Sequence, residues 1–349
     1  MEHIFLLSGD YIVLGREEVF SLFKIRGNKL TDRLLVVDLN GELDAKLIKR
    51  LALTKNIYRL LFECKPDGLI GSLKRFDWNS VYKKDFCVRT FFIDENKDEL
   101  VKKYSESKLA NFIWDNIKSP KVNFRNPKTL ITVFISKDKS VCGVQEFENR
   151  QDFESRKAHR RPFPHPSSLH PKVARALVNI SEIKENEILL DPFCGTGGFL
   201  IEAGLMKIKS VGYDINKIMT KGCRENLQYF KISSKIKTKN ALDLEDKFDC
   251  VVTDLPYGLN SNAKTGYEKD WKKFRLNRKI QKEGFTEGLE KFYLDFLKNL
   301  RAKLKKKAVI IFPSYVNYRK ILRTAGFRIE KEFSNYVHRS LTRKIVKIS

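Results

Sequence analysis

The chain has 349 residues, of which 42% are hydrophobic, and this suits two or three packed domains rather than a disordered chain. Its 68 basic and 43 acidic residues give a formal net charge of +25, which favours nucleic acid over a small acidic molecule as the partner. The six cysteines form no C-x-x-C pair and lie at no metal-ligand spacing with histidine, so neither a metal site nor a disulfide framework is expected.

No stretch of the sequence approaches the roughly 18 consecutive apolar residues of a membrane-spanning helix. The segment from Met1 to Ser8 lacks a basic leader followed by an apolar core. We therefore expect a cytoplasmic protein that does not associate with membranes. The net charge alone is equally consistent with a lysine-rich, solvated surface, so the motifs must decide the partner.

The N-terminal half alternates strand and helix signals and contains no catalytic constellation. Residues 1–64 predict a small α+β domain, with strands at 4–7, 34–38 and 57–62 and helices at 11–23 and 44–53. Residues 65–150 predict a second domain, with strands at 86–93, 130–135 and 141–147 and one long helix at 98–117. The function of both domains is left open by these patterns.

Residues 151–170 are predicted to link this half to a third domain at 171–349. The basic run 156–161 in this linker suits a solvated junction as well as a phosphate contact. The third domain alternates predicted helices at 171–180, 198–207, 217–230, 286–306 and 316–325 with predicted strands at 189–191, 211–214, 236–239, 249–253, 309–312, 329–336 and 341–348. This order predicts an α/β fold, a doubly wound, mostly parallel sheet with an antiparallel hairpin at one edge.

The chain is organised around a short strand that runs into a glycine-rich turn and then into an apolar helix. The strand ends at Asp191, and the predicted cofactor-binding residues of the turn are Cys194, Gly195, Thr196, Gly197 and Gly198. Glycines let a ligand approach the backbone, and the free N–H groups of the next helical turn favour a polar group of that ligand. Asp214 ends a second strand, where a carboxylate can accept both hydroxyls of a ribose. Because the turn is neither a phosphate loop nor a strict G-x-G-x-x-G, S-adenosylmethionine fits better than ATP or NAD.

A later motif, Asp254-Leu255-Pro256-Tyr257-Gly258, is the residue set of an amino-group methyltransferase. Residues 191–198, Asp214 and 254–258 resemble motifs I, II and IV of Rossmann-type S-adenosylmethionine methyltransferases in order and spacing. More narrowly, Arg-Pro-Phe-Pro-His-Pro-Ser-Ser-Leu at 161–169 and Val-His-Arg-Ser-Leu-Thr-Arg at 337–343 resemble the archaeal tRNA guanosine-10 N2-methyltransferases. The resemblance covers essentially the whole chain. It implies a ferredoxin-like domain at 1–64, a THUMP RNA-binding domain at 65–150, S-adenosylmethionine as cofactor and tRNA as partner.

The chemistry expected at this motif starts from the guanine amine, a poor nucleophile because its lone pair is delocalised into the ring. The Asp254 carboxylate and the Leu255 carbonyl can accept both N2 hydrogens and hold the nitrogen in line with the sulfonium methyl. Pro256 fixes the turn, and Tyr257 offers a face on which a flipped base can stack. Asp254 is therefore predicted to serve both catalysis and the cofactor site. Asn240 stands where the family usually has an aspartate that accepts from the adenine amine, and its side-chain oxygen can accept the same bond.

We expect S-adenosylmethionine-dependent methylation of a guanosine N2 in tRNA, specifically guanosine 10, with one or two methyl transfers. Alternatives are N2 methylation elsewhere in tRNA or in ribosomal RNA, N6 methylation of DNA adenine, and a non-catalytic RNA-binding protein. The THUMP-like half argues against DNA, and the intact aspartate set argues against a non-catalytic protein. Covalent catalysis by Cys194 is disfavoured because that residue belongs to the cofactor turn. The polar segment 259–283 is predicted to be a loop that orders on RNA, and an activating protein subunit is not implied by the sequence.

Overall fold

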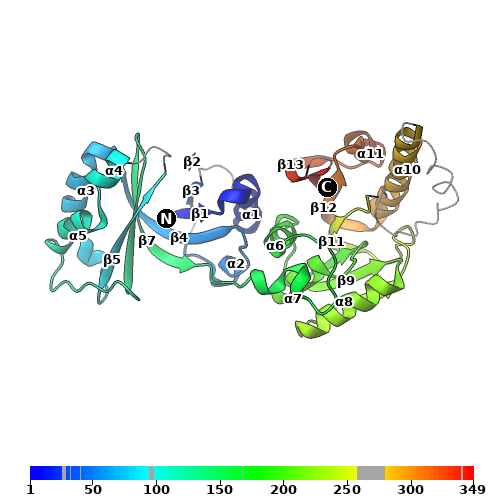
Figure 1. The fold of residues 1–349 in the computed structure, drawn as a ribbon, viewed down its shortest axis with the longest axis horizontal. Coiled ribbons are helices and arrows are strands. Elements are labelled where there is room, and N and C mark those ends of the chain that lie inside the picture. The colour runs from blue at the N-terminus through cyan, green and yellow to red at the C-terminus, as the bar shows by residue number, and fades with distance from the viewer. Residues whose placement is uncertain are drawn as a thin grey trace. The chain divides into compact units, whose positions relative to one another are not determined.

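The computed structural model describes residues 1–25, 29–31, 33–39, 41–93, 98–166, 168–257, 280–338 and 341–349. These form two compact units (Figure 1). The first unit comprises residues 1–16, 23–49 and 53–150, and the second comprises 17–22, 50–52 and 151–349. None of the described helices is both long and apolar enough to span a bilayer.

One seven-stranded sheet runs through the first unit in the order β2-β3-β1-β4-β7-β6-β5. Its strands are β1 (Glu2–Leu7), β2 (Lys29–Thr31), β3 (Leu34–Asp38), β4 (Thr54–Cys64), β5 (Phe86–Phe92), β6 (Thr129–Ile135) and β7 (Ser140–Glu148). All neighbours are antiparallel except β5 and β6. Strand β4 pairs with β1 on one side and β7 on the other, so a single sheet crosses the predicted boundary at 64/65, and the division into two domains stays a prediction.

The helices of the N-terminal segments are α1 (Ile12–Phe23), α2 (Ala45–Ile48), α3 (Leu69–Arg75), α4 (Asp98–Lys103) and α5 (Glu106–Trp114). Of these, α1 matches the one predicted at 11–23, α2 is shorter than the one predicted at 44–53, and α3 was not predicted. The single helix expected at 98–117 is wrong, because Ser105 adopts an extended backbone. The preceding Tyr104 is buried, and its hydroxyl donates to the Pro66 carbonyl at 2.8 Å. A tertiary contact therefore interrupts the helical periodicity at this point.

The second unit contains the predicted α/β sheet, in the order β10-β9-β8-β11-β12-β14-β13. Its strands are β8 (Ile188–Asp191), β9 (Lys209–Asp214), β10 (Lys235–Thr238), β11 (Phe248–Asp254), β12 (Leu304–Pro313), β13 (Ile329–His338) and β14 (Leu341–Ile348). Strands β8 to β12 are parallel, and β14 is antiparallel to both β12 and β13. The expected fold class is confirmed. The strand order reverses between β8 and β11, which is where such sheets bind ligands.

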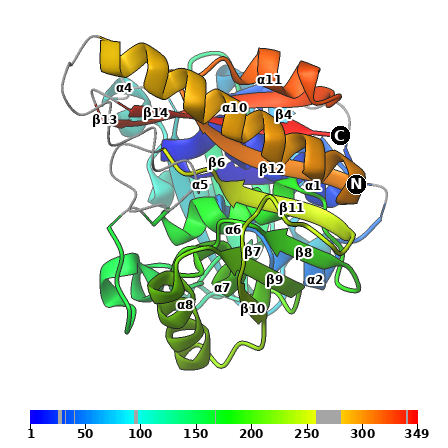
Figure 2. The same cartoon turned by 90° about the vertical axis from the view of Figure 1, so that its right-hand side faces the viewer.

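Helices cover this sheet and include α6 (Pro171–Ile180), α7 (Gly198–Leu205), α8 (Lys217–Tyr229), α10 (Ile280–Lys303) and α11 (Tyr318–Thr324). In Figure 2, α10 and α11 lie together beside β12. Phe296 of α10 packs into one buried cluster with Leu190 and Ile310 of the sheet. The helix expected at 286–306 ends at Lys303, where β12 begins. The predicted loop 259–283 lies outside the described residues up to 279, and its last four residues belong to α10.

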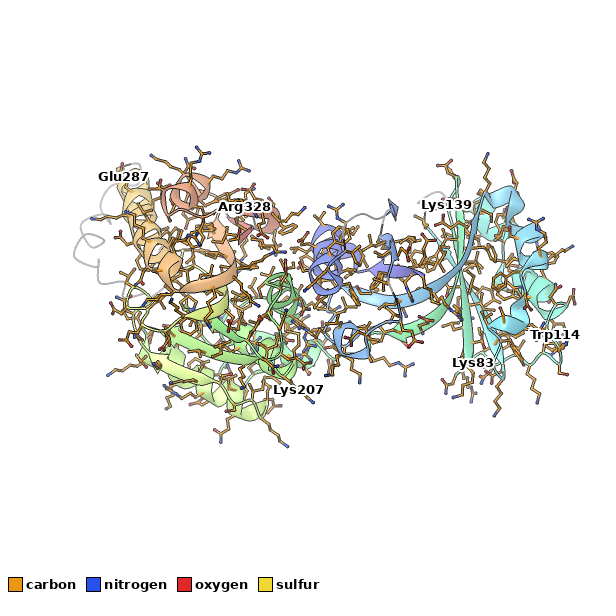
Figure 3. The ribbon with its side chains drawn as sticks, turned by 180° about the vertical axis from the view of Figure 1, so that it is seen from behind. Lys83, Trp114, Lys139, Lys207, Glu287 and Arg328 are labelled. Carbon is orange, nitrogen blue, oxygen red and sulfur yellow. The ribbon has the colours of Figure 1, made fainter. Side chains whose placement is uncertain are left out.

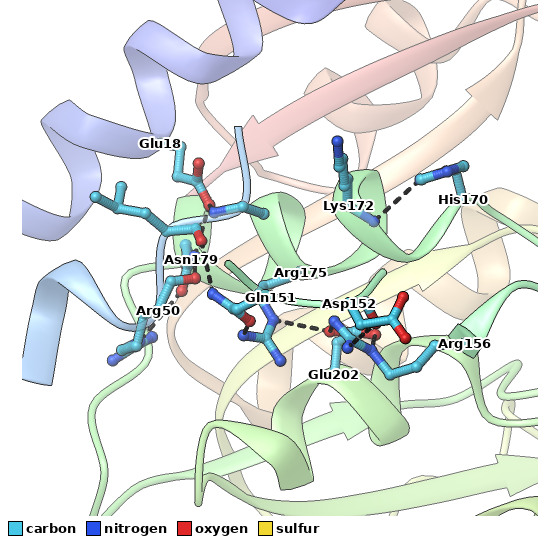
Figure 4. A network of polar contacts seen from close by, with 12 residues as sticks. Glu18, Arg50, Gln151, Asp152, Arg156, His170, Lys172, Arg175, Asn179 and Glu202 are labelled. Atoms are coloured by element: carbon cyan, nitrogen blue, oxygen red, sulfur yellow. Dashed lines mark hydrogen bonds and ion pairs between the residues drawn. The ribbon is translucent and has the colours of Figure 1, made fainter. Parts of the chain in front are cut away.

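A buried ion cluster fixes α7 against α6 and the segment before it (Figure 4). Glu202 of α7 is fully buried and accepts from Arg156 Nε at 2.7 Å and from Arg175 Nε at 2.7 Å. Next to this cluster, Arg50 Nε donates to Asn179 Oδ1 at 3.1 Å. Charged side chains can be buried in an interior when each is paired with a group of opposite charge. The residues predicted as a linker are thus partly core of the second unit, since Phe153 also lies beneath the Arg156 guanidinium.

Candidate active site

The glycine-rich turn joins β8 to α7 and needs glycine at two positions. Gly195 and Gly197 have φ values of +48° and +89°, in the region where other residues are strained. A Cβ at Gly197 would also lie 2.8 Å from the Cys223 sulfur, whereas a Cβ at Gly195 would meet nothing within 4 Å. The turn is therefore packed on its Cys223 side and has open space beside Gly195. Such an opening next to the N-terminus of α7 fits a ligand that approaches the backbone.

Asp214, at the end of β9, is bonded to this turn. Its Oδ2 accepts from the Gly195 N–H at 3.0 Å, and its Oδ1 accepts from the Asn216 N–H at 2.8 Å. Burial raises the pKa of Asp214 above its ordinary value, although these two bonds oppose the shift. Asn216 caps α8 by accepting from the Ile218 N–H, a role the motif analysis did not assign. The carboxylate thus ties the glycine turn to the start of α8.

Asp191, at the end of β8, is almost fully buried and bonded inward. Its Oδ1 accepts from Thr253 Oγ1 at 2.8 Å and from the Phe193 N–H at 3.2 Å. The pKa of Asp191 is raised to about 7, mainly by burial and in smaller part by the charges of Asp214 and Asp254. The bond to Thr253 joins β8 to β11. Thr253 is a site residue that the sequence reasoning missed, because a threonine inside an apolar strand reads as core.

Thr196 belongs to a set of bonds that hold the segment 161–169 against the turn. Asn226, buried on α8, donates to the carbonyls of Thr196 and Phe163 at 3.0 Å each. The Thr196 hydroxyl also lies 3.3 Å from the Ser168 hydroxyl. The motif at 161–169, of which Ser167 lies outside the described residues, therefore packs on the glycine turn through an asparagine that the sequence reasoning did not single out.

Two further predicted cofactor residues are Cys194, within this turn, and Asn240, which lies two strands away after β10. Cys194 is buried, and its contact with the Cys223 thiol together with burial raises its pKa well above the ordinary value. A thiol held protonated is a poor nucleophile, which agrees with the argument against covalent catalysis. Asn240 follows β10, and its Oδ1 accepts from the Leu242 N–H at 3.0 Å. One lone pair of that oxygen is thereby used within its own loop.

Three hydrogen bonds to its backbone hold the turn after β11 in place. The Leu255 N–H donates to the Ile311 carbonyl of β12 at 3.2 Å. The Tyr293 hydroxyl of α10 donates to the Pro256 carbonyl at 2.8 Å, and the Tyr315 hydroxyl donates to the Tyr257 carbonyl at 2.7 Å. Both tyrosines were missed by the sequence reasoning, since nothing local marks them. Gly258, the last residue of the motif, lies outside the described residues.

The side chains of this turn form a charged cluster with Arg343 of β14. The Tyr257 hydroxyl donates to Asp254 Oδ1, Arg343 Nε donates to the Tyr257 oxygen at 3.0 Å, and Arg343 Nη2 lies 3.4 Å from Asp254 Oδ2. Burial raises the pKa of Asp254 to about 6 even though Arg343 lowers it. Burial and the Asp254 charge raise the pKa of Tyr257, so its phenol remains a donor.

Sheet topology brings these groups to one edge. Asp191, Asp214 and Asp254 end three adjacent parallel strands, with β8 between β9 and β11, so their carboxylates lie at the same end of the sheet, at its switch point. Asn240 follows β10, the next strand. Among the described residues, no cluster of histidine, cysteine or acidic side chains could hold a metal ion.

Comparison with known proteins identifies the family to which the chain belongs. A model described as RMKL-like, methyltransferase domain, matches residues 158–284. The tRNA (guanine(10)-N2)-dimethyltransferase of Methanothermobacter thermautotrophicus is 31% identical over 99% of this chain and 98% of its own length. The chain belongs to the tRNA (guanine(10)-N2)-dimethyltransferase family. The family protein of Pyrococcus abyssi is 29% identical over 95% of this chain and 94% of its own.

The tRNA (guanine(10)-N2)-dimethyltransferase family thus extends over both units, as the sequence resemblance implied. A more distant relative, the tRNA (guanine(6)-N2)-methyltransferase of Methanocaldococcus jannaschii, is 23% identical over 70% of this chain and 78% of its own. The crystal structure of TrmN from Thermus thermophilus shares the fold with a TM-score of 0.51 at 16% identity, covering 100% of this chain and 99% of that one. Family membership confirms an S-adenosylmethionine-dependent methyltransferase.

Proposed function

We propose that the chain transfers methyl groups from S-adenosylmethionine to the exocyclic N2 of guanosine 10 in tRNA, giving the monomethyl and then the dimethyl product, and that it does so in the cytoplasm. The observation that carries the proposal is the position of Asp254 at the end of β11 with Leu255 directly after it, because β11 is the sheet neighbour of β8, the strand that leads into the glycine turn. That position supports an amine held between two acceptors and aimed at a methyl donor. The relatives that align along nearly the whole chain carry this activity in their names.

The cofactor is assigned to the open space beside Gly195 and to the ends of β8, β9 and β10. When bound there, it supplies the sulfonium methyl group. We assign Asp214 to the ribose hydroxyls, through lone pairs that its two backbone bonds leave free. Asn240 takes the adenine amine with the remaining lone pair of Oδ1. Gly195, Thr196, Gly197 and Gly198 provide backbone to the methionine end, with Asp191 and Cys194 supporting the turn from within.

Asp254 is assigned the amine of the target base. Each of its oxygens already has one partner, Tyr257 or Arg343, and a carboxylate oxygen has a second lone pair. Asp254 can therefore accept one N2 hydrogen without releasing either partner, while the Leu255 carbonyl accepts the other. The resulting ammonium product is acidic, so a carboxylate whose pKa is about 6 suffices to take its proton. After one transfer a single N2 hydrogen remains, and one acceptor is enough for the second.

Capture of the RNA is assigned to the first unit, the THUMP region of the resemblance. Bonds between its loops gather six exposed basic residues around the start of β5, namely Lys83, Lys84, Lys118, Lys121, Arg125 and Lys128. Trp114 and Phe124 are exposed nearby, with 43% and 72% of their surfaces accessible; Lys83 and Trp114 project from this end in Figure 3. Cations with exposed aromatic rings suit phosphates and unpaired bases.

The experiment is methylation of an unmodified tRNA transcript with methyl-labelled cofactor, followed by nucleoside analysis and mapping of the modified position. We expect N2-methylguanosine and N2,N2-dimethylguanosine at position 10. The Asp254→Asn variant should lose the product, while Asp246→Asn, an exposed aspartate of the same unit, should keep it. Label at guanosine 6, in ribosomal RNA or on adenine would contradict the proposal. Cofactor binding without transfer to any RNA would support the non-catalytic alternative.

A further inference from the structure

Arg343, in the C-terminal motif 337–343, contacts the turn after β11. The proposed function does not assign it a role in methyl transfer. Its side chain is 11% exposed. It contacts both side chains of the turn, since Nε donates to the Tyr257 oxygen and Nη2 faces Asp254 Oδ2. The same guanidinium lies 5.9 Å from the centre of the Tyr257 ring. One side chain thus touches the proposed stacking residue and the proposed acceptor together.

The backbone that carries Arg343 is fixed on both sides. Strand β14 lies between β12 and β13, and Arg343 is opposite Pro313 on one neighbour and Asn335 on the other. From this position its side chain reaches past β12 to the end of β11. A guanidinium presents several donors in a rigid plane and can bond two acceptors at once, whereas a lysine ammonium acts as a point charge. The two contacts therefore depend on the arginine fork and not on charge alone.

We propose that Arg343 is a positioning residue for methyl transfer: it locks the Asp254 carboxylate and the Tyr257 hydroxyl into one unit and balances the charge of that carboxylate. The proposal rests on the proposed function and deepens it. It explains why a residue far along the chain belongs to the site. Asp254 then presents its free lone pairs in a fixed direction, and Tyr257 keeps its ring orientation when a base arrives.

The surroundings of Asp254 show why a cation matters there. Among the residues that the structure describes, the ionisable groups that interact with it are Asp191 of β8, Tyr257 of its own turn, Tyr293 of α10 and Arg343 of β14. Of these, only Arg343 carries a positive charge. Burial already raises the pKa of Asp254 to about 6 against the pull of Arg343. Loss of Arg343 would leave burial opposed mainly by the Tyr257 hydrogen bond, so a larger fraction of the carboxyl would be protonated at neutral pH, and a neutral carboxyl is a weaker acceptor for the amine than a carboxylate.

The test is the pH dependence of single-turnover methylation at saturating cofactor and tRNA, from about pH 5 to about pH 9. The acid limb of the wild-type rate should have its inflection near the Asp254 pKa of about 6. In Arg343→Gln the inflection should move up by about 1 to 3 units. The rate at neutral pH should then fall by about 2- to 100-fold and recover at high pH. Arg343→Lys should keep the wild-type inflection but lower the rate at every pH, because an ammonium point charge replaces the rigid planar fork.

Lys344→Gln is the matched control. It removes one positive charge from the neighbouring residue of β14, whose ammonium instead contacts Ser334, and its profile should coincide with the wild type. Calorimetric binding of S-adenosylmethionine should stay within about threefold for all three variants, which verifies that the second unit is folded. If Arg343→Gln does not fold, Arg343→Lys provides the test, because its rate should fall at every pH while the inflection stays at the wild-type pH.

A second readout is independent of methyl transfer. Carboxyl ¹³C NMR of the free protein, with the Asp254 signal identified by its loss in Asp254→Asn, should show the same upward movement in Arg343→Gln. An unmoved inflection in both measurements, with a uniform loss of rate, would overturn the proposal. If the wild type transferred no methyl group to guanine N2, the proposed function would fail, while the NMR titration would still decide whether Arg343 balances Asp254.

Discussion

Replacement of Asp214 separates cofactor affinity from catalysis. The carboxylate accepts from the N–H groups of Gly195 and Asn216, and in our proposal its remaining lone pairs take the ribose hydroxyls. Hydrogen bonds to a charged group contribute about 1.5 to 3 kcal/mol. Asp214→Ala should therefore raise the dissociation constant of S-adenosylmethionine by about 10- to 150-fold. Asp214→Asn keeps a neutral acceptor for one backbone N–H and should have the smaller effect.

The assay is titration calorimetry at several pH values, with Glu225→Ala as the control because Glu225 pairs with the exposed Lys221 on the surface of α8. Burial raises the pKa of Asp214, so acidification protonates it more readily than an exposed aspartate. Wild-type affinity should then fall as the pH is lowered, and Asp214→Asn should lose that part of the pH dependence. An Asp214→Ala affinity within about threefold of the wild type would refute the ribose assignment.

Three other predictions concern turnover, stability and RNA binding. Asp254→Ala should leave cofactor and tRNA affinity nearly intact while lowering single-turnover methylation by at least about 100-fold, as for loss of a preorganised polar group; near-normal turnover would contradict the mechanism. Glu202→Ala leaves the buried Arg156 and Arg175 without their carboxylate and should lower the free energy of unfolding by about 3 to 5 kcal/mol. Glu202→Gln should lower it less. An unchanged free energy in denaturant unfolding would contradict a stabilising role of this ion cluster. Affinity for tRNA should fall by about 10³ to 10⁵ from about 50 to about 200 mM salt if roughly 6 to 10 phosphates are contacted, and a flat response would exclude that mode of binding.

The sequence predicted the parts of the site whose signal is local. A strand, a glycine turn and a helix succeed each other within the 18 residues from Ile188 to Leu205, and backbone conformation alone requires glycine at Gly195 and Gly197. The order of strands and helices likewise predicted a mostly parallel sheet with an antiparallel edge. These features follow from propensity, periodicity and topology rules, which operate over short stretches of chain.

What the sequence did not predict is the set of side chains that reach the site from a distance. Arg343 bonds to a residue 86 positions earlier, and Tyr315 to one 58 positions earlier. Tyr315 stands in no local pattern, and the motif 337–343, which ends in Arg343, indicated a family but not this contact. The same limit explains the helix break at Ser105, where a bond from the buried Tyr104 to Pro66 outweighs helical periodicity. Tertiary contacts decide such positions.

Buried contacts of Arg156 and Arg50 make truncation a poor test of the two units. A fragment beginning at residue 160 would lack Arg156, one of the two partners of Glu202. It would also lack Arg50, which donates to Asn179. Loss of activity in that fragment would therefore mix lost RNA capture with a damaged core. Charge-reversing substitutions among the exposed basic residues of the first unit, such as Lys121→Glu, test RNA capture without that damage.

The central claim is that methyl transfer occurs at the amino group on C2 of guanine 10, held by Asp254 and the Leu255 carbonyl. The most direct measurement compares two otherwise identical tRNA transcripts, one with guanosine and one with inosine at position 10, since inosine lacks only that amino group. We predict transfer of label to the guanosine transcript and none to the inosine transcript, with equal binding of both. Equal labelling of the two transcripts would contradict the account.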